Sequence, residues 1–262
     1  MSEFVVISWE QVGYAAGFLA VAILVSLFLK LGVAGRIIVG GFRTFAQLLI
    51  LGYILGYVFA QRNLGLTVLV FALMVLVASV NAYTMESRRR LSTIPLFFFT
   101  LSLVLIIIVF PIGKLILALK PWFLPQYVIP FGGMVIGNAM TAGMLAQNHL
   151  SRLLKAERAV VETKLALGAD PLASAYPQLV ESVRTGLVPT INMMMVVGLV
   201  HIPGIFGGVV LAGVPPVEAA KYQIVVMYML AMAASLTTFI VSWMKLRTLF
   251  TRRAQLRLEE LG

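Results

Sequence analysis

Polar and sulfur-bearing side chains gather at two places inside long apolar stretches of this chain of 262 residues. Polar groups within such stretches are costly in lipid and are candidates for function. Amide oxygens suit harder cations, whereas thioethers suit soft ones. Both kinds of group could therefore line a translocation pathway for a cation. The candidate pathway residues are Asn138, Met140, Thr141 and Met144 in the first cluster, and Asn192, Met193, Met194 and Met195 in the second.

These clusters also have structural interpretations. Methionine fills irregular gaps between helices, and asparagine forms hydrogen bonds between membrane-spanning helices. From the sequence, both packing and a pathway role remain open for the methionines and for Asn138 and Asn192.

His201 and Glu86 are the remaining candidates for metal ligands. Histidine binds metals and titrates near neutral pH, and Glu86 could guard an entrance at the edge of an apolar stretch. We expect His201 to be an interfacial side chain and Glu86 to be an exposed surface charge, so no metal site is predicted. With two histidines, no cysteine and no carboxylate inside an apolar stretch, the sequence offers no acid–base constellation for an enzyme.

The composition indicates a membrane protein. Hydrophobic residues make up 61% of the chain and charged residues 11%, against about 25% charge in soluble domains. About 20 apolar residues cross a bilayer, and each crossing segment is expected to be helical. The prediction is an all-α polytopic fold, one transmembrane domain over residues 1–262 with about seven spanning helices. These are residues 12–29, 37–59, 64–83, 94–119, 128–147, 187–211 and 222–244.

Lys and Arg residues predict the orientation of these helices. If alternate loops face the same side, 16 of the 20 basic residues fall on one side. The excess of Lys and Arg marks the cytoplasmic side. We therefore expect an outer N-terminus, a cytoplasmic segment at 148–186 and a cytoplasmic basic tail at 245–262, in a multi-pass protein of the cell membrane. The net charge of +10 then indicates contact with anionic lipid rather than nucleic acid.

The sixth apolar run is irregular. It contains Pro203 followed by Gly204, and a straight helix through Pro203 would lose a backbone hydrogen bond. The span is therefore expected to end near His201. Residues 205–214 would then form either an external loop or a re-entrant piece beside a gate.

The charged segment at 148–186 reads as two helices with a break between them. Residues 151–167 have the spacing of an amphipathic helix in which Arg158 and Glu162 can pair. Gly168 is a C-terminal stop. Asp170 can cap a new helix with Pro171 at its first position, predicting a short helix over 172–176.

A short cytoplasmic helix between two spans can fit a groove on a soluble motor and transmit its movement. Glu162 and Gly168 have the separation of the Glu-Ala-Ala-x-x-x-Gly loop of import-type ABC permeases, although Thr163 and Lys164 replace its alanines. A plain cytoplasmic connector is the alternative. The residues assigned to coupling are Glu162, Gly168, Asp170, Pro171, Leu172, Ala173, Ser174 and Tyr176.

Longer blocks of sequence resemble one family. They are Lys164-Leu-Ala-Leu-Gly-Ala, Pro189-Thr-Ile-Asn-Met-Met-Met-Val-Val-Gly-Leu-Val, Ala220-Lys-Tyr-Gln-Ile and Gly137-Asn-Ala-Met-Thr. Together they resemble the Fet-type iron-export ABC permeases, whose plant relatives are linked to aluminium tolerance. Ala139, Met193 and His201 depart from that family's pattern.

The resemblance implies a homodimeric permease that exports iron or another metal ion and works with two copies of a separate ATPase. The chain itself lacks a Gly-x-x-x-x-Gly-Lys-Ser/Thr phosphate loop. ATP and magnesium are therefore expected on the partner, and no cofactor is expected on this chain. A secondary carrier or channel for a cation or small solute, working without an ATPase, is the alternative, and a lipid-modifying membrane enzyme is a third hypothesis.

Overall fold

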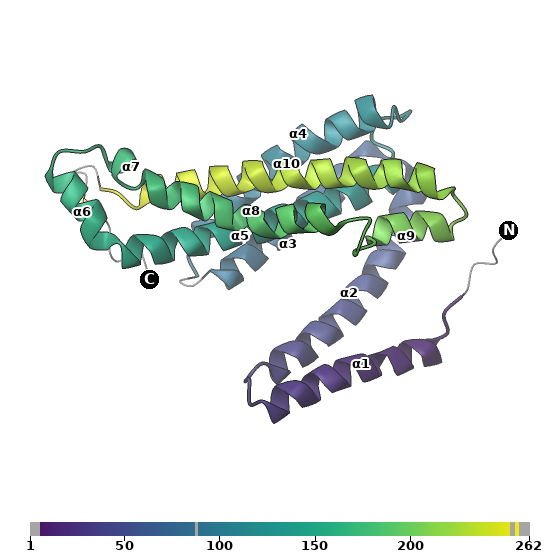
Figure 1. Cartoon of the computed structure of the whole chain (residues 1–262). Coiled ribbons are helices and arrows are strands. Elements are labelled where there is room, and N and C mark those ends of the chain that lie inside the picture. The colour runs from purple at the N-terminus through teal and green to yellow at the C-terminus, as the bar shows by residue number, and fades with distance from the viewer. Residues whose placement is uncertain (1–5, 87–88, 252–254, 257–262) are drawn as a thin grey trace. The chain divides into compact units, whose positions relative to one another are not determined.

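The computed structural model describes residues 6–86, 89–251 and 255–256. Helices account for the regular structure in these ranges, and the β-type pairings found there are isolated bridges. The predicted all-α class is therefore confirmed for the part of the chain that is described. The chain divides into two compact units, residues 1–62 with 211–213 and residues 63–210 with 214–262 (Figure 1).

The first unit is a pair of helices, α1 (Trp9–Phe28) and α2 (Ala34–Gln61). The helices approach closely where Gly41 meets Leu19, because a Cβ on Gly41 would lie 2.3 Å from a Leu19 methyl carbon. Small residues allow this kind of close contact between helices in lipid.

The second unit is a helical bundle around α5. Its long helices are α3 (Leu64–Met85), α4 (Thr93–Pro111) with the π-helical turn η1 (Ile112–Ile116), α5 (Pro125–Ala156), α8 (Tyr176–Val196) and α10 (Pro216–Thr248). α5 packs against α3, α4, α8 and α10, and Figure 1 shows α5, α8 and α10 running side by side.

Glycines set the separation of these helices. A Cβ on Gly143 of α5 would lie 2.9 Å from a Thr237 methyl carbon of α10. A Cβ on Gly186 of α8 would lie 2.8 Å from both the Ala142 carbonyl oxygen and the Ala146 Cβ of α5. Because atoms this close would overlap, α5 can contact both neighbours only with glycine at these positions.

Among the described residues, six helices are long and apolar enough to span a membrane: α1, α2, α3, α4 with η1, α5 and α10. The chain is thus a multi-pass membrane protein, while the predicted count of seven spans is not confirmed. The sixth predicted span, 187–211, is not one helix. In its place α8 ends at Val196 and α9 (Gly204–Leu211) follows after a break.

The break begins earlier than the sequence predicted. The helical path ends at Val197, which is extended (φ −63°, ψ 134°), and Gly198 follows with a φ of +83°, a conformation that ordinary residues rarely adopt. The expectation that the helix would reach His201 is therefore wrong. Residues 204–211 form the helix α9, and whether this piece is external or re-entrant stays open.

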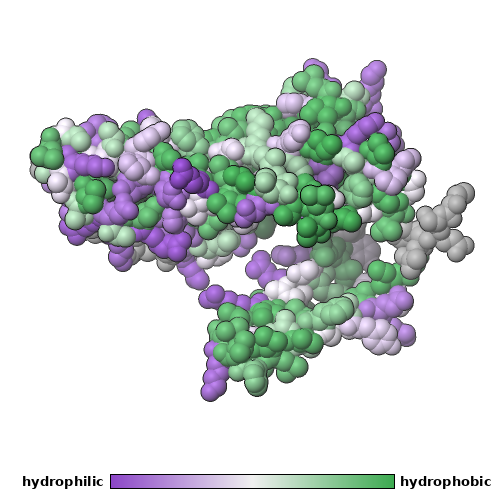
Figure 2. Space-filling model, in the orientation of Figure 1, coloured by the Kyte–Doolittle hydropathy of each residue, from purple (hydrophilic) through white to green (hydrophobic). Residues whose placement is uncertain are grey.

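One end of the second unit projects well beyond the length of a single span. At 1.5 Å per residue, the 32 residues of α5 measure about 48 Å, against roughly 30 Å of hydrocarbon. The projecting end carries α6 (Arg158–Ala166) and α7 (Pro171–Ser174). Figure 2 shows much of the hydrophilic surface of this view gathered there. We call it the α6–α7 end.

The predicted amphipathic helix over 151–167 is two helices. α5 continues through Ala156, the chain turns at Glu157 (φ −101°, ψ 22°), and α6 starts at Arg158. Gln178 of α8 donates to the Glu157 carboxylate at 2.6 Å, which holds the corner against the next helix. This partner is 21 residues away, so helical spacing alone did not reveal the turn.

Candidate functional site

The short helix α7 is set by local caps. The amides of Gly168 and Ala169 donate to the carbonyls of Leu165 and Lys164, both at 3.0 Å, and Gly168 has a φ of +88°. This arrangement is a Schellman motif. The Asp170 carboxylate accepts from the amides of Leu172 and Ala173 at 2.9 and 3.3 Å. The predicted glycine stop and aspartate cap are both confirmed.

A small apolar core, which we call the end core, lies beneath α7. Its buried members come from α5, α6, α8, α10 and the segments beside them: Leu150, Leu154, Val161, Ala175, Leu179, Leu246, Leu249 and Leu256. Leu165 and Leu172 pack against it. Because Leu172 packs on these buried residues, the end core joins α7 to the long helices of the bundle.

The coupling residues predicted from sequence divide into inward and outward groups. Leu172 packs on the end core, and Ser174 is buried with its hydroxyl donating to the Asp170 carbonyl at 2.9 Å. Ala173 is exposed, and Tyr176 is 57% exposed. The inward pair therefore holds the short helix in place, while the outward pair is accessible to another molecule.

Leu167 was missed by the sequence analysis. It is 83% exposed at the end of α6, beside the Gly168 turn. Leu167 does not follow the helical spacing of Leu154, Val161 and Leu165, and this could have indicated in the sequence that it is exposed. Leu167, Ala173 and Tyr176 are exposed apolar or aromatic residues of the segment that runs from the end of α6 to the start of α8, and we call these three residues the coupling ridge.

Glu162 and Lys164 of α6 form two polar contacts near these residues. Glu162 pairs with Arg158 at 2.8 Å, as the spacing predicted, but both side chains are more than 40% exposed. Exposed pairs stabilise a fold by about 0–1 kcal/mol. The Lys164 ammonium donates to the Ser174 carbonyl at 3.5 Å and so ties α6 to the end of α7.

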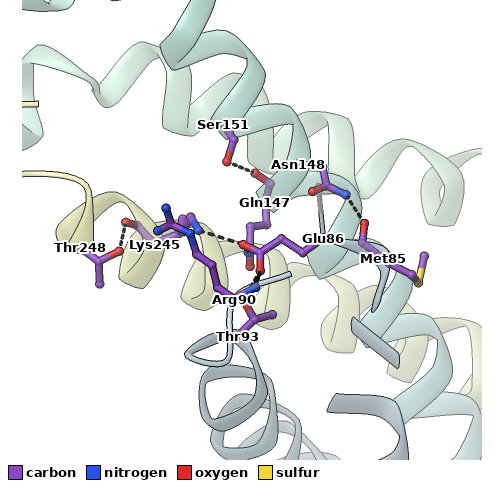
Figure 3. A network of polar contacts seen from close by, with 9 residues as sticks. All are labelled: Met85, Glu86, Arg90, Thr93, Gln147, Asn148, Ser151, Lys245 and Thr248. Atoms are coloured by element: carbon purple, nitrogen blue, oxygen red, sulfur yellow. Dashed lines mark hydrogen bonds and ion pairs between the residues drawn. The ribbon is translucent and has the colours of Figure 1, made fainter. Parts of the chain in front are cut away.

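Glu86 is the centre of a buried polar network near this same end (Figure 3). Glu86 is only 7% exposed, so the expectation that it is an exposed surface charge is wrong. One carboxylate oxygen accepts from Gln147 of α5 at 2.8 Å and from Lys245 of α10 at 3.0 Å. The other accepts from the Arg90 amide at 3.1 Å and from the Thr93 hydroxyl. We call these five residues the Glu86 network.

The ionised form of Glu86 is favoured. Burial raises the pKa of this carboxyl, but hydrogen bonds from Thr93, the Arg90 amide and Lys245, with the positive charge of Lys245, bring its pKa below the ordinary value. The carboxylate thus stays charged at neutral pH. In this form its hydrogen bonds hold the α3–α4 connection against α5 and α10.

The pathway residues predicted from sequence do not converge on one cavity. Asn138 of α5 accepts from the Thr190 hydroxyl of α8 at 3.4 Å, and Met144 is buried in the bundle. Asn192 and Met195 are exposed on α8, with Met195 at 74%. Asn138 thus takes part in an interhelical hydrogen bond and Met144 in packing, while a pathway role for either stays a prediction.

Of two further pathway residues on α5, Met140 contacts α3 and Thr141 is exposed. The Asn81 amide of α3 donates to the Met140 sulfur at 3.8 Å. The Thr141 hydroxyl is bonded to the Gly137 carbonyl of its own helix at 3.0 Å, and Thr141 is exposed. Met193 is half-buried on α8.

Met194 lies in a cavity of about 390 Å³ at the break after α8. The opposite wall is α10, which contributes Gln223 and Met227. Gln223 is 6% exposed, and its amide oxygen Oε1 has no hydrogen-bond partner among the described residues. A buried acceptor left unpaired costs about 1–3 kcal/mol, so a ligand that brings a donor or a cation would relieve this cost.

No group of three or more His, Cys, Asp or Glu side chains that could hold a metal ion occurs within the described ranges. Glu86 is already engaged by four donors. His201 is exposed in the turn after α8, where its carbonyl accepts from the Gly198 amide at 3.0 Å. Neither metal candidate from the sequence therefore lies in a formed ligand cluster.

Residues 9–250 match the model of an uncharacterised protein family, UPF0014. The chain is 35% identical over 252 residues to the probable iron export permease protein FetB of Escherichia coli, covering 96% of both chains. It is 32% identical to protein ALUMINUM SENSITIVE 3 of Arabidopsis thaliana, covering 90% of this chain and 85% of that relative. A membrane protein of Synechocystis, slr1647, is 34% identical over 253 residues. No solved structure matches the chain.

Proposed function

Because the chain belongs to the UPF0014 family of membrane proteins, which includes relatives named for iron export and for aluminium sensitivity, we propose that it is the permease subunit of an ABC transporter. The transporter exports iron or another metal ion. A separate ATPase subunit binds ATP and magnesium and supplies the energy, and the permease itself catalyses no reaction.

The coupling ridge is the observation that carries this proposal. It exposes Leu167, Ala173 and Tyr176 on a hydrophilic end, and α7 beneath it is fixed by the Asp170 cap and the end core. A groove on the ATPase receives the ridge. Movement of that groove then displaces α5, α8 and α10 together, because all three contribute to the end core.

The cavity at the end of α8 is the proposed binding site for the transported cation. Its thioethers, Met194 and Met227, and the unpaired Gln223 oxygen can replace part of the water around a cation. A broken helix within a span also persists where protein or a water-filled cavity covers it. Displacement of α8 against α10 would change the size of this cavity.

A second copy of the chain completes the proposed permease. Asn81, Thr141 and Asn192 are exposed on α3, α5 and α8, and polar groups facing lipid are costly. The second copy covers these three residues. Since the chain has no cysteine, Asn192→Cys should give a crosslinked dimer in membranes, whereas Phe99→Cys, exposed on α4, should not.

The decisive experiment combines ATPase capture with transport. The chain is co-expressed with a candidate ATPase, purified, and placed in vesicles loaded with iron or other metals, with and without ATP. Ala173→Glu should abolish capture of the ATPase and ATP-dependent transport, because it puts a charge on the coupling ridge. The matched control is Val217→Glu, which is exposed in the first turn of α10.

ATP-independent transport by the wild-type protein would instead support a secondary carrier. Equal capture of the ATPase by Ala173→Glu and Val217→Glu would refute the ridge as the docking surface.

A further inference from the structure

The cavity beside Met194 is lined by two helices that pack together, α8 and α10, by the turn after α8 and by Phe206 of α9. Met194 of α8 is half-buried, and Met227 of α10 is 4% exposed. Gln223 precedes Met227 by four residues, so both side chains lie on one face of α10, about one turn apart. Two thioethers and one amide therefore belong to the lining of a single cavity.

The thioethers are soft ligands without a stronger competitor in this chain. The sequence has no cysteine, so no thiolate is present to take a soft metal ion from them. Thioethers prefer soft ions such as Cu(I), whereas carboxylates, carbonyls and water suit harder ions. The Gln223 oxygen Oε1 has no hydrogen-bond partner among the described residues and is a further ligand for an ion held by the two sulfur atoms.

The lining of this cavity carries no charge. Among the described residues that line it, none is acidic, basic or histidine. The nearest charged residues along α10, Glu218 and Lys221, pair with each other at 2.7 Å and so add no net charge. The cost of moving an ion out of water rises with the square of its charge, so a divalent ion costs about four times as much as a monovalent ion of equal size. Without a carboxylate to offset this cost, the cavity favours a single positive charge.

We propose that this cavity binds a soft monovalent cation of the class of Cu(I) and Ag(I). The inference rests on the proposed function, in which the same cavity holds the transported cation, and it narrows that cation to one class. Met194 and Met227 supply sulfur ligands from α8 and α10. The rings of Phe206 and Tyr228 in the same lining attract a cation without adding charge. Fe(II) binds there more weakly, because the lining offers no anionic ligand.

Leucine substitutions separate a ligand role of these methionines from packing. Leucine has nearly the volume of methionine, and cores tolerate this exchange well. Met194→Leu and Met227→Leu therefore each remove one sulfur atom while keeping the cavity wall. The matched control is Met229→Leu, because Met229 is also on α10 and 5% exposed but lines a different cavity.

The experiment measures the binding of Ag(I) to the purified full chain, without a histidine tag, by isothermal titration calorimetry. Wild type should bind Ag(I) and retain it against an excess of Fe(II) or K⁺, and X-ray absorption should show sulfur ligands. Met194→Leu and Met227→Leu should each weaken the binding at least about tenfold, because mutation even of groups that only orient metal ligands costs about 10–100-fold. Met229→Leu should bind Ag(I) as wild type does.

Three results overturn the proposal: no binding of Ag(I), displacement of Ag(I) by equimolar Fe(II), or equal binding of Ag(I) by Met194→Leu, Met227→Leu and Met229→Leu. Transport by the permease and its ATPase in vesicles separates this failure from failure of the proposed function. ATP-dependent iron transport by a permease that does not bind Ag(I) would refute the soft-cation site and leave the transporter standing. Ag(I) binding that depends on Met194 and Met227, without ATP-dependent transport of any metal, would refute the transporter and leave the site standing.

Discussion

The Lys245 ammonium lies 3.0 Å from the Glu86 carboxylate although 159 residues separate them in the chain. Glu86 follows the last residue of α3, Lys245 is in the last turn of α10, and Gln147 of α5 donates to the same carboxylate. α3, α5 and α10 therefore run in the same direction and are tied together near the α6–α7 end. The Glu86 network and the end core thus fix one end of the bundle by polar and apolar contacts respectively.

Removing the charge of Glu86 should strongly destabilise the bundle. Glu86→Gln leaves the Lys245 ammonium buried without its counter-ion, a situation that costs about 3–5 kcal/mol. The free energy of unfolding, measured in mixed micelles, should fall by that order. Glu162→Gln provides the matched control, because its pair with Arg158 is exposed and contributes at most about 1 kcal/mol. Adding Lys245→Met to Glu86→Gln should recover part of the loss, and equal losses for Glu86→Gln and Glu162→Gln would contradict the network's role.

Acid should lower the stability of the protein against unfolding by protonating Glu86. The folded pKa of Glu86 lies below its ordinary value, which is about 4.3 in an unfolded chain. Its stabilising contribution is therefore complete above that pH and is lost as the pH falls through the lower, folded pKa. Unfolding measured from neutral pH down to about pH 3 should show a steeper loss for wild type than for Glu86→Gln. Parallel curves for the two proteins would show that Glu86 ionises identically in the folded and unfolded states.

The parts predicted well from sequence depend on neighbours in the chain. The Gly168 stop, the Asp170 cap and the Arg158–Glu162 pair each involve residues within about one helical turn, so spacing was sufficient. The all-α class also followed, because lipid leaves the backbone no partner outside the helix.

The parts that were mispredicted depend on distant partners. Burial of Glu86 requires Lys245, and the turn at Glu157 is held by Gln178. The early end of α8 lies at an extended Val197 followed by a left-handed Gly198, and the sequence alone does not reveal these backbone angles. Leu172 packs on the end core and Ala173 is exposed, and this difference likewise depends on residues far away in the sequence.

A methyl group at Gly186 should disturb the contact of α8 with α5 and α10. Its Cβ would lie 2.7 Å from a Thr238 methyl carbon and 2.8 Å from the Ala142 carbonyl oxygen. Overpacking of this kind costs about 1–3 kcal/mol, so Gly186→Ala should lower the thermal midpoint in detergent. Gly137→Ala is the matched control on α5, since a Cβ there meets nothing within 4 Å. If both variants lower the midpoint equally, the close approach at Gly186 is not limiting.

The cap of α7 can be separated from the charge of its capping residue. Asp170→Asn keeps a side-chain oxygen for the amides of Leu172 and Ala173, whereas Asp170→Ala removes it. Loss of an N-cap costs about 1 kcal/mol, which is enough to loosen a helix of four residues. We expect Asp170→Ala, but not Asp170→Asn, to reduce capture of the partner ATPase in a pull-down. Reduced capture by both variants would instead assign the effect to the negative charge.

Substitutions at Gln223 test whether the cavity beside Met194 binds the transported metal or has only a structural role. Gln223 lines the cavity beside Met194, and its Oε1 is buried with no hydrogen-bond partner among the described residues. Gln223→Leu therefore removes an unsatisfied acceptor and should leave the protein equally or more stable. Transport of the metal in vesicles should nevertheless fall, because the cation loses a carbonyl ligand in the proposed binding site. Gln223→Asn retains the amide one methylene further back and should transport better than Gln223→Leu. The control is Gln178→Leu, which removes the donor to Glu157 at the other end of the bundle and should lower stability. Unchanged transport by a stable Gln223→Leu protein would remove this cavity from the pathway.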